Sequence, residues 1–262
     1  MDTAKSHRKV AGCPASTLVA LLSLLCLCKV SLSLAASPPL PFDAEYEARY
    51  GGFRASAERS LHNTEDGGIE MNTRLDLKLL GKTISSIQEV SSLTKDAVTG
   101  QIRPLVYTFE QTGLGKRSRS VSFDWDSAIA IATSGRQENT IALEGLAMDS
   151  LSGYIALREQ LLAGHKEVTF QSVDKGEMHD FNYVVTGEEW LETSAGSFRT
   201  LKLERVRDTE SSRATEIWLA LDWDYLLVKL VQREPGAKII SLELTGATVD
   251  GKPVVPADSG AG

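Results

Sequence analysis

The sequence predicts an all-β protein with one helix, in which about eleven strands form a single curved antiparallel sheet shaped as a half-barrel. Three observations support this fold class. Short stretches of alternating apolar and polar residues recur along the chain. Clusters of Gly, Pro, Asn or Asp separate these stretches at intervals of roughly 8 to 12 residues. The helical crossovers of a parallel sheet are missing, because only residues 149–163 carry apolar side chains at helical spacing.

The chain begins with a predicted signal peptide, residues 1–36. Lys5, Arg8 and Lys9 precede an apolar stretch of about twelve residues, and a Ser-Leu-Ala triplet supplies the small residues that signal peptidase requires. Lys29 interrupts the apolar run well short of the roughly 20 residues that span a bilayer, so cleavage is favoured over an uncleaved anchor. All three cysteines lie in this segment. The sequence therefore predicts export to a bacterial periplasm and a mature chain without cysteine.

The β-rich domain is predicted to span residues 42–249. Alternation starts at residues 44–50, and the Gly51-Gly52 pair then leads into a second strand, so the two form a hairpin. Residues 69–80 are the clearest amphipathic strand. Three leucines share its apolar face: Leu75, Leu77 and Leu79. Such alternation gives each strand one solvated face and one covered face.

The helix predicted at residues 149–163 interrupts this series of strands. Asp149 or Ser150 is a suitable cap, and Gly164 is placed to end the helix. Its apolar stripe has to be buried, and the covered, concave face of the sheet is the large apolar surface on offer. Residues 250–262 hold too few large apolar groups to pack and are predicted to be a flexible tail.

Charge and motifs exclude several functions. A net charge of −7 argues against a nucleic-acid partner, which needs a basic surface. The Gly-Lys-Thr at residues 81–83 is not a phosphate-binding loop, because Asp76 occupies the position where that loop needs a glycine. The histidines are too scattered to predict a metal site. The sequence indicates no catalytic residues and no cofactor.

Several ordered blocks of the sequence resemble a known family. They are YEARYGGFRASAE (46–58), FDW (123–125), DSLSGYIALR (149–158), GSFRTLKLERV (196–206) and WLALDWDYLLVKL (218–230). Together they resemble an exported bacterial family known as domain of unknown function 3108, which implies no activity. The predicted architecture is also similar to the periplasmic lipoprotein carrier and its outer-membrane receptor. That likeness implies a hollow that shields acyl chains.

Two main hypotheses about function follow. In the first, the concave side binds an apolar or amphiphilic ligand, such as a lipid or an acylated protein. The residues expected to line it are Leu75, Leu77, Leu79, Leu151, Tyr154, Ile155, Leu201, Leu203 and Trp218. In the second, the protein is an envelope interaction or scaffold module with a fully packed core and a protein partner. A hydrolase acting on the cell envelope is the least favoured alternative.

Overall fold

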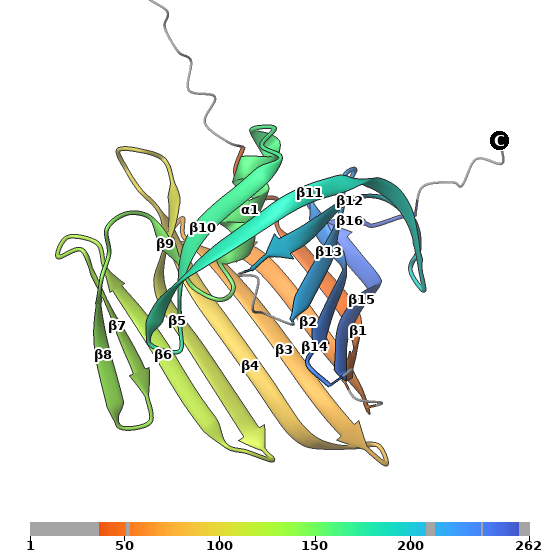
Figure 1. Cartoon of the computed structure of the whole chain (residues 1–262), viewed down its shortest axis with the longest axis horizontal. Coiled ribbons are helices and arrows are strands. Elements are labelled where there is room, and N and C mark those ends of the chain that lie inside the picture. Colours follow the sequence, from red (N-terminus) through yellow and green to blue (C-terminus); the bar gives the residue numbers. More distant parts are fainter. Residues whose placement is uncertain (1–36, 51–52, 208–212, 237, 257–262) are drawn as a thin grey trace, which may run out of the picture. The chain divides into compact units, whose positions relative to one another are not determined.

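One long sheet curves around a single helix in the computed structural model of the chain (Figure 1). The structure describes residues 37–50, 53–207, 213–236 and 238–256, which belong to the unit formed by residues 35–262. The predicted signal peptide and residues 257–262 of the predicted tail lie outside the described residues.

The described residues form sixteen strands and one helix. These are β1 (Phe42–Tyr50), β2 (Phe53–Asn63), β3 (Ile69–Leu79), β4 (Lys82–Lys95), β5 (Ile102–Gly113), β6 (Arg117–Asp124), β7 (Ile129–Ser134), β8 (Gln137–Ala142), β9 (Ala147–Met148), α1 (Gly153–Leu162), β10 (Glu167–Asp174), β11 (Glu177–Thr193), β12 (Gly196–Val206), β13 (Ala214–Ala220), β14 (Leu226–Glu234), β15 (Lys238–Val249) and β16 (Lys252–Pro253).

The all-β class with one helix is confirmed, and the number of strands exceeds the predicted eleven. The hairpin of β7 and β8 escapes pattern analysis, because β7 is apolar without strict alternation and β8 is almost entirely exposed. In contrast, the sequence pattern predicts two separate strands within residues 179–187 and 188–196, but the structure has one strand there, β11. The glycine between them, Gly187, lies at a register shift opposite β12 and not in a turn.

The sheet follows the order β8-β7-β6-β5-β4-β3-β2-β1-β15-β14-β13-β12-β11-β10-β9. Neighbours are antiparallel except for the short parallel pair of β9 and β10, and β16 pairs with β15. The first strand, β1, pairs with β15 and so joins the N-terminal and C-terminal halves. The sheet therefore extends into the segment predicted as a flexible tail, because β16 and a hydrogen bond from Val254 N to Ala247 O hold its start.

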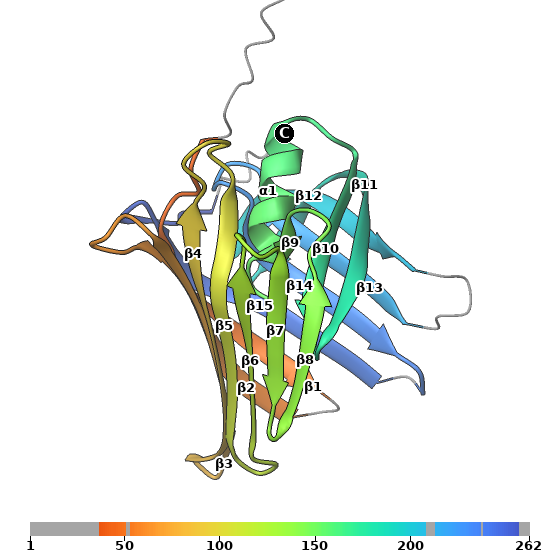
Figure 2. The same ribbon diagram turned by 90° about the vertical axis from the view of Figure 1, so that its left-hand side faces the viewer.

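Strong curvature brings the two ends of the sheet close together (Figure 2). Irregular pairing interrupts the ladders between β1 and β15, β3 and β4, β4 and β5, β11 and β12, and β13 and β14. Such bulges bend strands and increase twist. Where the two ends of the sheet approach each other, the Asn139 amide donates a hydrogen bond to the Gly176 carbonyl at 3.4 Å. This bond links β8 to the β10–β11 hairpin. The sheet is thus an open barrel that nearly closes.

Helix α1 lies inside the curve, next to β10 (Figure 1). It begins four residues later than predicted, because residues 149–152 form a hydrogen-bonded turn before the first helical residue. Its predicted end is confirmed: Gly164 follows the C-cap with a φ of +83°, a conformation that favours glycine. Ile155 and Leu161 are buried in the same core as the inner face of the sheet.

Candidate ligand-binding site in the hollow of the sheet

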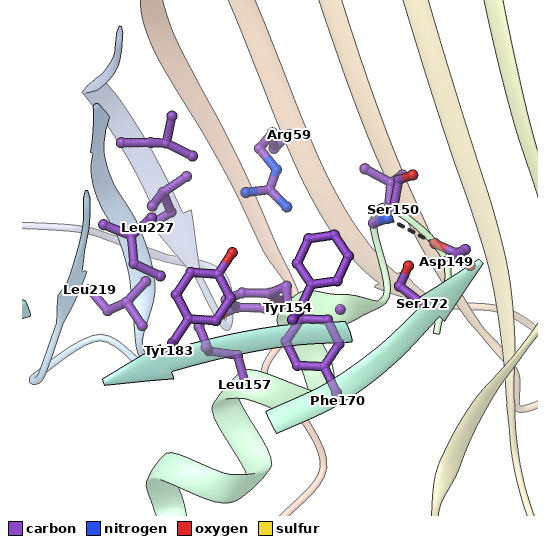
Figure 3. Close-up of a pocket in the computed structure, with 15 residues that line it drawn as sticks. Arg59, Asp149, Ser150, Tyr154, Leu157, Phe170, Ser172, Tyr183, Leu219 and Leu227 are labelled. Atoms are coloured by element: carbon purple, nitrogen blue, oxygen red, sulfur yellow. Dashed lines mark hydrogen bonds between the residues drawn. The ribbon is translucent and has the colours of Figure 1, made fainter. Parts of the chain in front are cut away.

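A cavity of about 140 Å³ lies between α1, the β10–β11 hairpin and the inner faces of β2, β13 and β14. Figure 3 shows its lining side chains converging from these elements. The apolar part of the lining is Leu151, Tyr154, Leu157, Phe170, Phe181, Tyr183, Ile217, Leu219, Leu227 and Leu230. Concave sites with a mainly apolar lining and a few polar groups are typical of small-molecule binding.

The turn that precedes α1 is fixed by Asp149, which is fully buried. Its carboxylate accepts hydrogen bonds from the backbone N of Leu151 at 2.8 Å and of Ser152 at 2.9 Å. It also accepts one from Ser91 Oγ on β4 at 2.6 Å. Burial nevertheless raises the pKa of this carboxyl above its usual range. The start of the helix is thereby tied to the wall that contains β4.

The opposite side of α1 is held by a buried ion pair. Arg158, which is 2% exposed, donates from Nε and Nη2 to the two carboxylate oxygens of Asp224 at 2.8 and 2.6 Å. Asp224 lies in the link between β13 and β14. The Arg158 guanidinium also donates to the carbonyls of Ser37 and Pro38, at 2.8 and 3.3 Å. Helix α1 therefore joins residues 37–38, which precede β1, to the β13–β14 side of the hollow.

Arg59 places a positive charge on the otherwise apolar inner face of β2. It is in phase with the buried Ala57 and Leu61, so it points into the hollow. Figure 3 shows its guanidinium directed toward Tyr154, with Cζ 5.8 Å from the ring centroid. It makes no hydrogen bond or ion pair with another residue in the described ranges.

A row of polar groups continues from Arg59 across the sheet. Thr73 pairs with Arg59, and Glu89 pairs with Thr73, so their side chains share the inner face. Glu89 accepts a hydrogen bond from the Tyr107 hydroxyl, and burial raises the pKa of the Glu89 carboxyl. The Thr73 hydroxyl is buried and has no partner among the described residues. One side of the hollow is therefore lined by charged and hydroxyl groups.

The structure brings some of the nine predicted lining residues together. Leu151 and Tyr154 line the cavity, and Ile155, Leu201 and Leu203 are buried in the core around it. Leu75 packs against the same core. Leu77 is half-buried further along β3.

Two predicted lining residues lie elsewhere. Leu79 is 54% exposed at the end of β3, after the register against β4 has shifted at Lys78. Trp218 lies between the cavity-lining Ile217 and Leu219, so it points to the outer face. There its indole N–H donates to Glu189, and the Lys202 ammonium lies 5.1 Å from its ring. Trp218 is buried by side chains of the outer face and not by the hollow.

Sequence reasoning missed the polar groups of the site, Arg59, Glu89 and Ser172. A signal for Arg59 was present, since it occupies an inward position in the alternation of β2. The signal from Ser172 was absent, because a serine in a strand is compatible with either face.

The open, nearly closed sheet around one helix defines a β-barrel-like protein, and comparisons with known proteins agree. A Brucella abortus protein of domain of unknown function DUF1849, described as beta-barrel-like, has a similar structure with a TM-score of 0.52 and 12% identity. The match covers 80% of this chain and 98% of that one. The chain belongs to the family described as "Protein of unknown function (DUF3108)", whose model matches residues 45–244.

Other comparisons add no argument about function. A Pseudomonas aeruginosa MucA/MucB complex matches with a TM-score of 0.15 and 10% identity, covering 80% of this chain and 88% of that one. No curated protein matches the sequence. Within the described ranges, no helix is long and apolar enough to cross a membrane. In the same part of the chain, no three His, Cys, Asp or Glu side chains are grouped so that they could hold a metal ion.

Proposed function

We propose that this protein is exported to the bacterial envelope, where it binds an apolar or amphiphilic ligand in the hollow of its sheet. The cavity between α1 and the two sides of the sheet is the observation that carries this proposal. The lining is dominated by leucine and aromatic side chains, which offer a lipid chain or an acyl group a dry surface. The partner would be a free lipid or the acyl group of a lipoprotein.

The size of the cavity favours a second candidate, an envelope interaction module with a packed core. Small-molecule sites usually span about 300–1,000 Å³, and this cavity is about 140 Å³. An engineered cavity of about 150 Å³ holds a molecule the size of benzene. A long chain would therefore need α1 to shift, whereas a scaffold module would need no ligand and would bind an envelope protein on its surface.

Native mass spectrometry of protein expressed with its N-terminal segment and purified from the periplasm separates the two candidates. The ligand-binding function predicts a bound lipid mass, and enhanced fluorescence of the neutral apolar dye N-phenyl-1-naphthylamine on mixing. The same spectrum tests export, since cleavage would leave a mature N-terminus close to residue 36. If the protein binds neither lipid nor dye, the ligand-binding function is contradicted and the scaffold function stands. An intact N-terminus would contradict cleavage.

A matched pair of variants places any binding in the cavity. Leu219→Trp adds bulk at a cavity-lining residue that is 1% exposed, and we expect it to abolish dye and lipid binding. Leu80→Trp makes the same change at a side chain that is 95% exposed in the β3–β4 turn, and binding should be unchanged. Equal binding by the two variants would place the ligand outside the cavity. Circular dichroism would verify that both variants are folded.

A further inference from the structure

We propose that the ligand of the hollow is an acidic amphiphile whose carboxylate or phosphate head group binds between Arg59 and Ser172. This inference rests on the proposed ligand-binding function and narrows its ligand to one chemical class. It is carried by two polar side chains of the described residues that face the same cavity and have no hydrogen-bond or ion-pair partner.

The first of them is the Arg59 guanidinium. A charge that faces an apolar cavity without a counterion is costly, and an entering anion removes that cost. The Glu89 carboxyl interacts electrostatically with Arg59, but it accepts a hydrogen bond from the Tyr107 hydroxyl and forms no ion pair with Arg59. The guanidinium is instead placed beside the Tyr154 ring, where its N–H groups remain available to a ligand.

The second is the hydroxyl of Ser172 on β10. This side chain lines the cavity and is 1% exposed, and its Oγ has no hydrogen-bond partner in the described part of the chain. Buried hydroxyl groups are almost always bonded, so an unpartnered one that lines a cavity indicates a missing partner. Ser172 reaches the cavity from the β10–β11 hairpin and Arg59 from β2, so a head group between them would bridge two parts of the fold (Figure 3).

Most of the other polar groups around the cavity already have hydrogen-bond partners, and the groups that remain decide which charge a ligand can carry. The Tyr154 hydroxyl donates to the Asp224 carbonyl at 3.3 Å. The Asp149 carboxylate accepts its three hydrogen bonds from Ser91 and from the backbone before α1. What remains is the Arg59 guanidinium, which can only donate, and the hydroxyls of Ser172 and Tyr183, which can donate. Such a set of donors favours an anionic oxygen over a cation.

The apolar lining of the cavity would contact the apolar part of the amphiphile. Leu157, Leu219 and Leu227 lie on the side of the cavity away from Ser172 in Figure 3. They would contact the carbons next to the head group. The present volume accommodates a head group and a few carbons only, so affinity should depend on the head group more than on chain length.

Isothermal titration calorimetry with a matched twelve-carbon series, kept below micelle formation, tests the inference. The series is dodecanoate, dodecyl phosphate, 1-dodecanol and dodecyltrimethylammonium. Wild-type protein should bind the two anions about ten- to a hundredfold more tightly than dodecanol, as a charge-assisted hydrogen bond implies. The ammonium compound should bind most weakly. The order of the two anions distinguishes a carboxylate from a phosphate ligand.

Variants of β2 and β10 locate the head group. Arg59→Gln should weaken anion binding much more than dodecanol binding and so remove most of the preference for anions, and Ser172→Ala should weaken anion binding several-fold. Arg54→Gln is the matched control, since Arg54 lies on the outer face of the same strand and pairs with Glu47. It should bind like wild type.

The outcomes separate the two proposals. If wild type binds dodecanol as tightly as dodecanoate, the head-group inference is wrong and the ligand-binding function stands. Anion preference that survives in Arg59→Gln would also overturn the inference. If no member of the series and no apolar dye binds, the proposed function itself fails. The wild-type series alone decides the first outcome, so the test does not depend on the folding of any variant.

Discussion

The inner faces of the two sides of the sheet differ in chemistry. On β2 to β4, Arg59, Thr73 and Glu89 form a polar row. On β12 to β14, the inner face next to the cavity carries the aliphatic side chains of Leu203, Ile217 and Leu219, and its polar members, Arg205 and Thr215, lie further along the strands. A core that served folding alone would not need this asymmetry, because buried charge is costly. The difference suits a ligand with one polar and one apolar end, and helix α1 bridges the two sides.

The largest expected loss of stability follows from breaking the Arg158–Asp224 ion pair, which holds α1 to the apolar side of the sheet. Arg158→Gln leaves Asp224 and two carbonyls without their buried partner. We expect it to lower the free energy of unfolding by about 3–5 kcal/mol, measured by urea denaturation. Arg199→Gln is the control, since it breaks an exposed pair with Asp222 at 2.8 Å and should change little. Similar losses in both would show that α1 is not held by this pair.

The second test compares a leucine-to-alanine substitution on the apolar side of the sheet with one on the polar side. Leu203→Ala removes a side chain that is 0% exposed on the apolar side, and should cost about 3 kcal/mol of stability. Leu79→Ala, at the exposed end of β3, should leave the denaturation midpoint nearly unchanged. A large effect at Leu79 would mean that this leucine is covered in solution, as the sequence suggested.

The third test concerns the pH dependence of the polar side. Burial raises the pKa of the Glu89 carboxyl, so its contribution to stability is greatest at low pH and is lost as the pH rises through the folded-state pKa. Glu89→Gln removes this dependence. The stability of the variant relative to wild type should therefore increase with pH above about 4.5, by at most about 1.4 kcal/mol per pH unit. Denaturation curves that differ by a constant amount between pH 4.5 and 8 would contradict the buried, raised-pKa assignment.

The smallest expected loss of stability is at Gly164, which follows the end of α1. Gly164 has a φ of +83°, and a Cβ added there would meet no atom within 4 Å, so Gly164→Ala should cost about 1 kcal/mol from backbone strain alone. Gly145 has equally open surroundings and no positive φ, so Gly145→Ala should be neutral or slightly stabilising. Thermal denaturation of the two variants would show the difference, and equal midpoints would argue against a left-handed residue after the helix.

Local patterns predicted much of the fold. The hairpin of β1 and β2 followed from alternation around a Gly-Gly pair, and the end of α1 followed from Gly164. Patterns failed where local sequence is ambiguous. The exposed strand β8 has no apolar face to detect, and Gly187 reads as a turn although it is a bulge within β11. Strand number therefore depended on pairing partners that local sequence does not specify.

The candidate site was less predictable than the fold. Leu201 and Leu203 on β12, which were predicted to line the hollow, are buried in the core around it, because period-two alternation assigns faces directly. Trp218 was assigned to the wrong face, since large aromatic residues suggest burial without saying on which side of the sheet. The outer face buries it through Lys202 and Glu189, whose positions depend on the pairing of β11, β12 and β13.

By itself, the sequence determined that the chain forms antiparallel strands and one helix with an apolar face to bury, because period-two and helical patterns are local properties of the residues. Only the tertiary structure decided that Arg59 and Ser172, 113 positions apart, face one cavity with no hydrogen bond to the rest of the described chain. The reason is physical: the face of a strand is set by alternation, but what lies opposite that face is set by how the whole sheet closes.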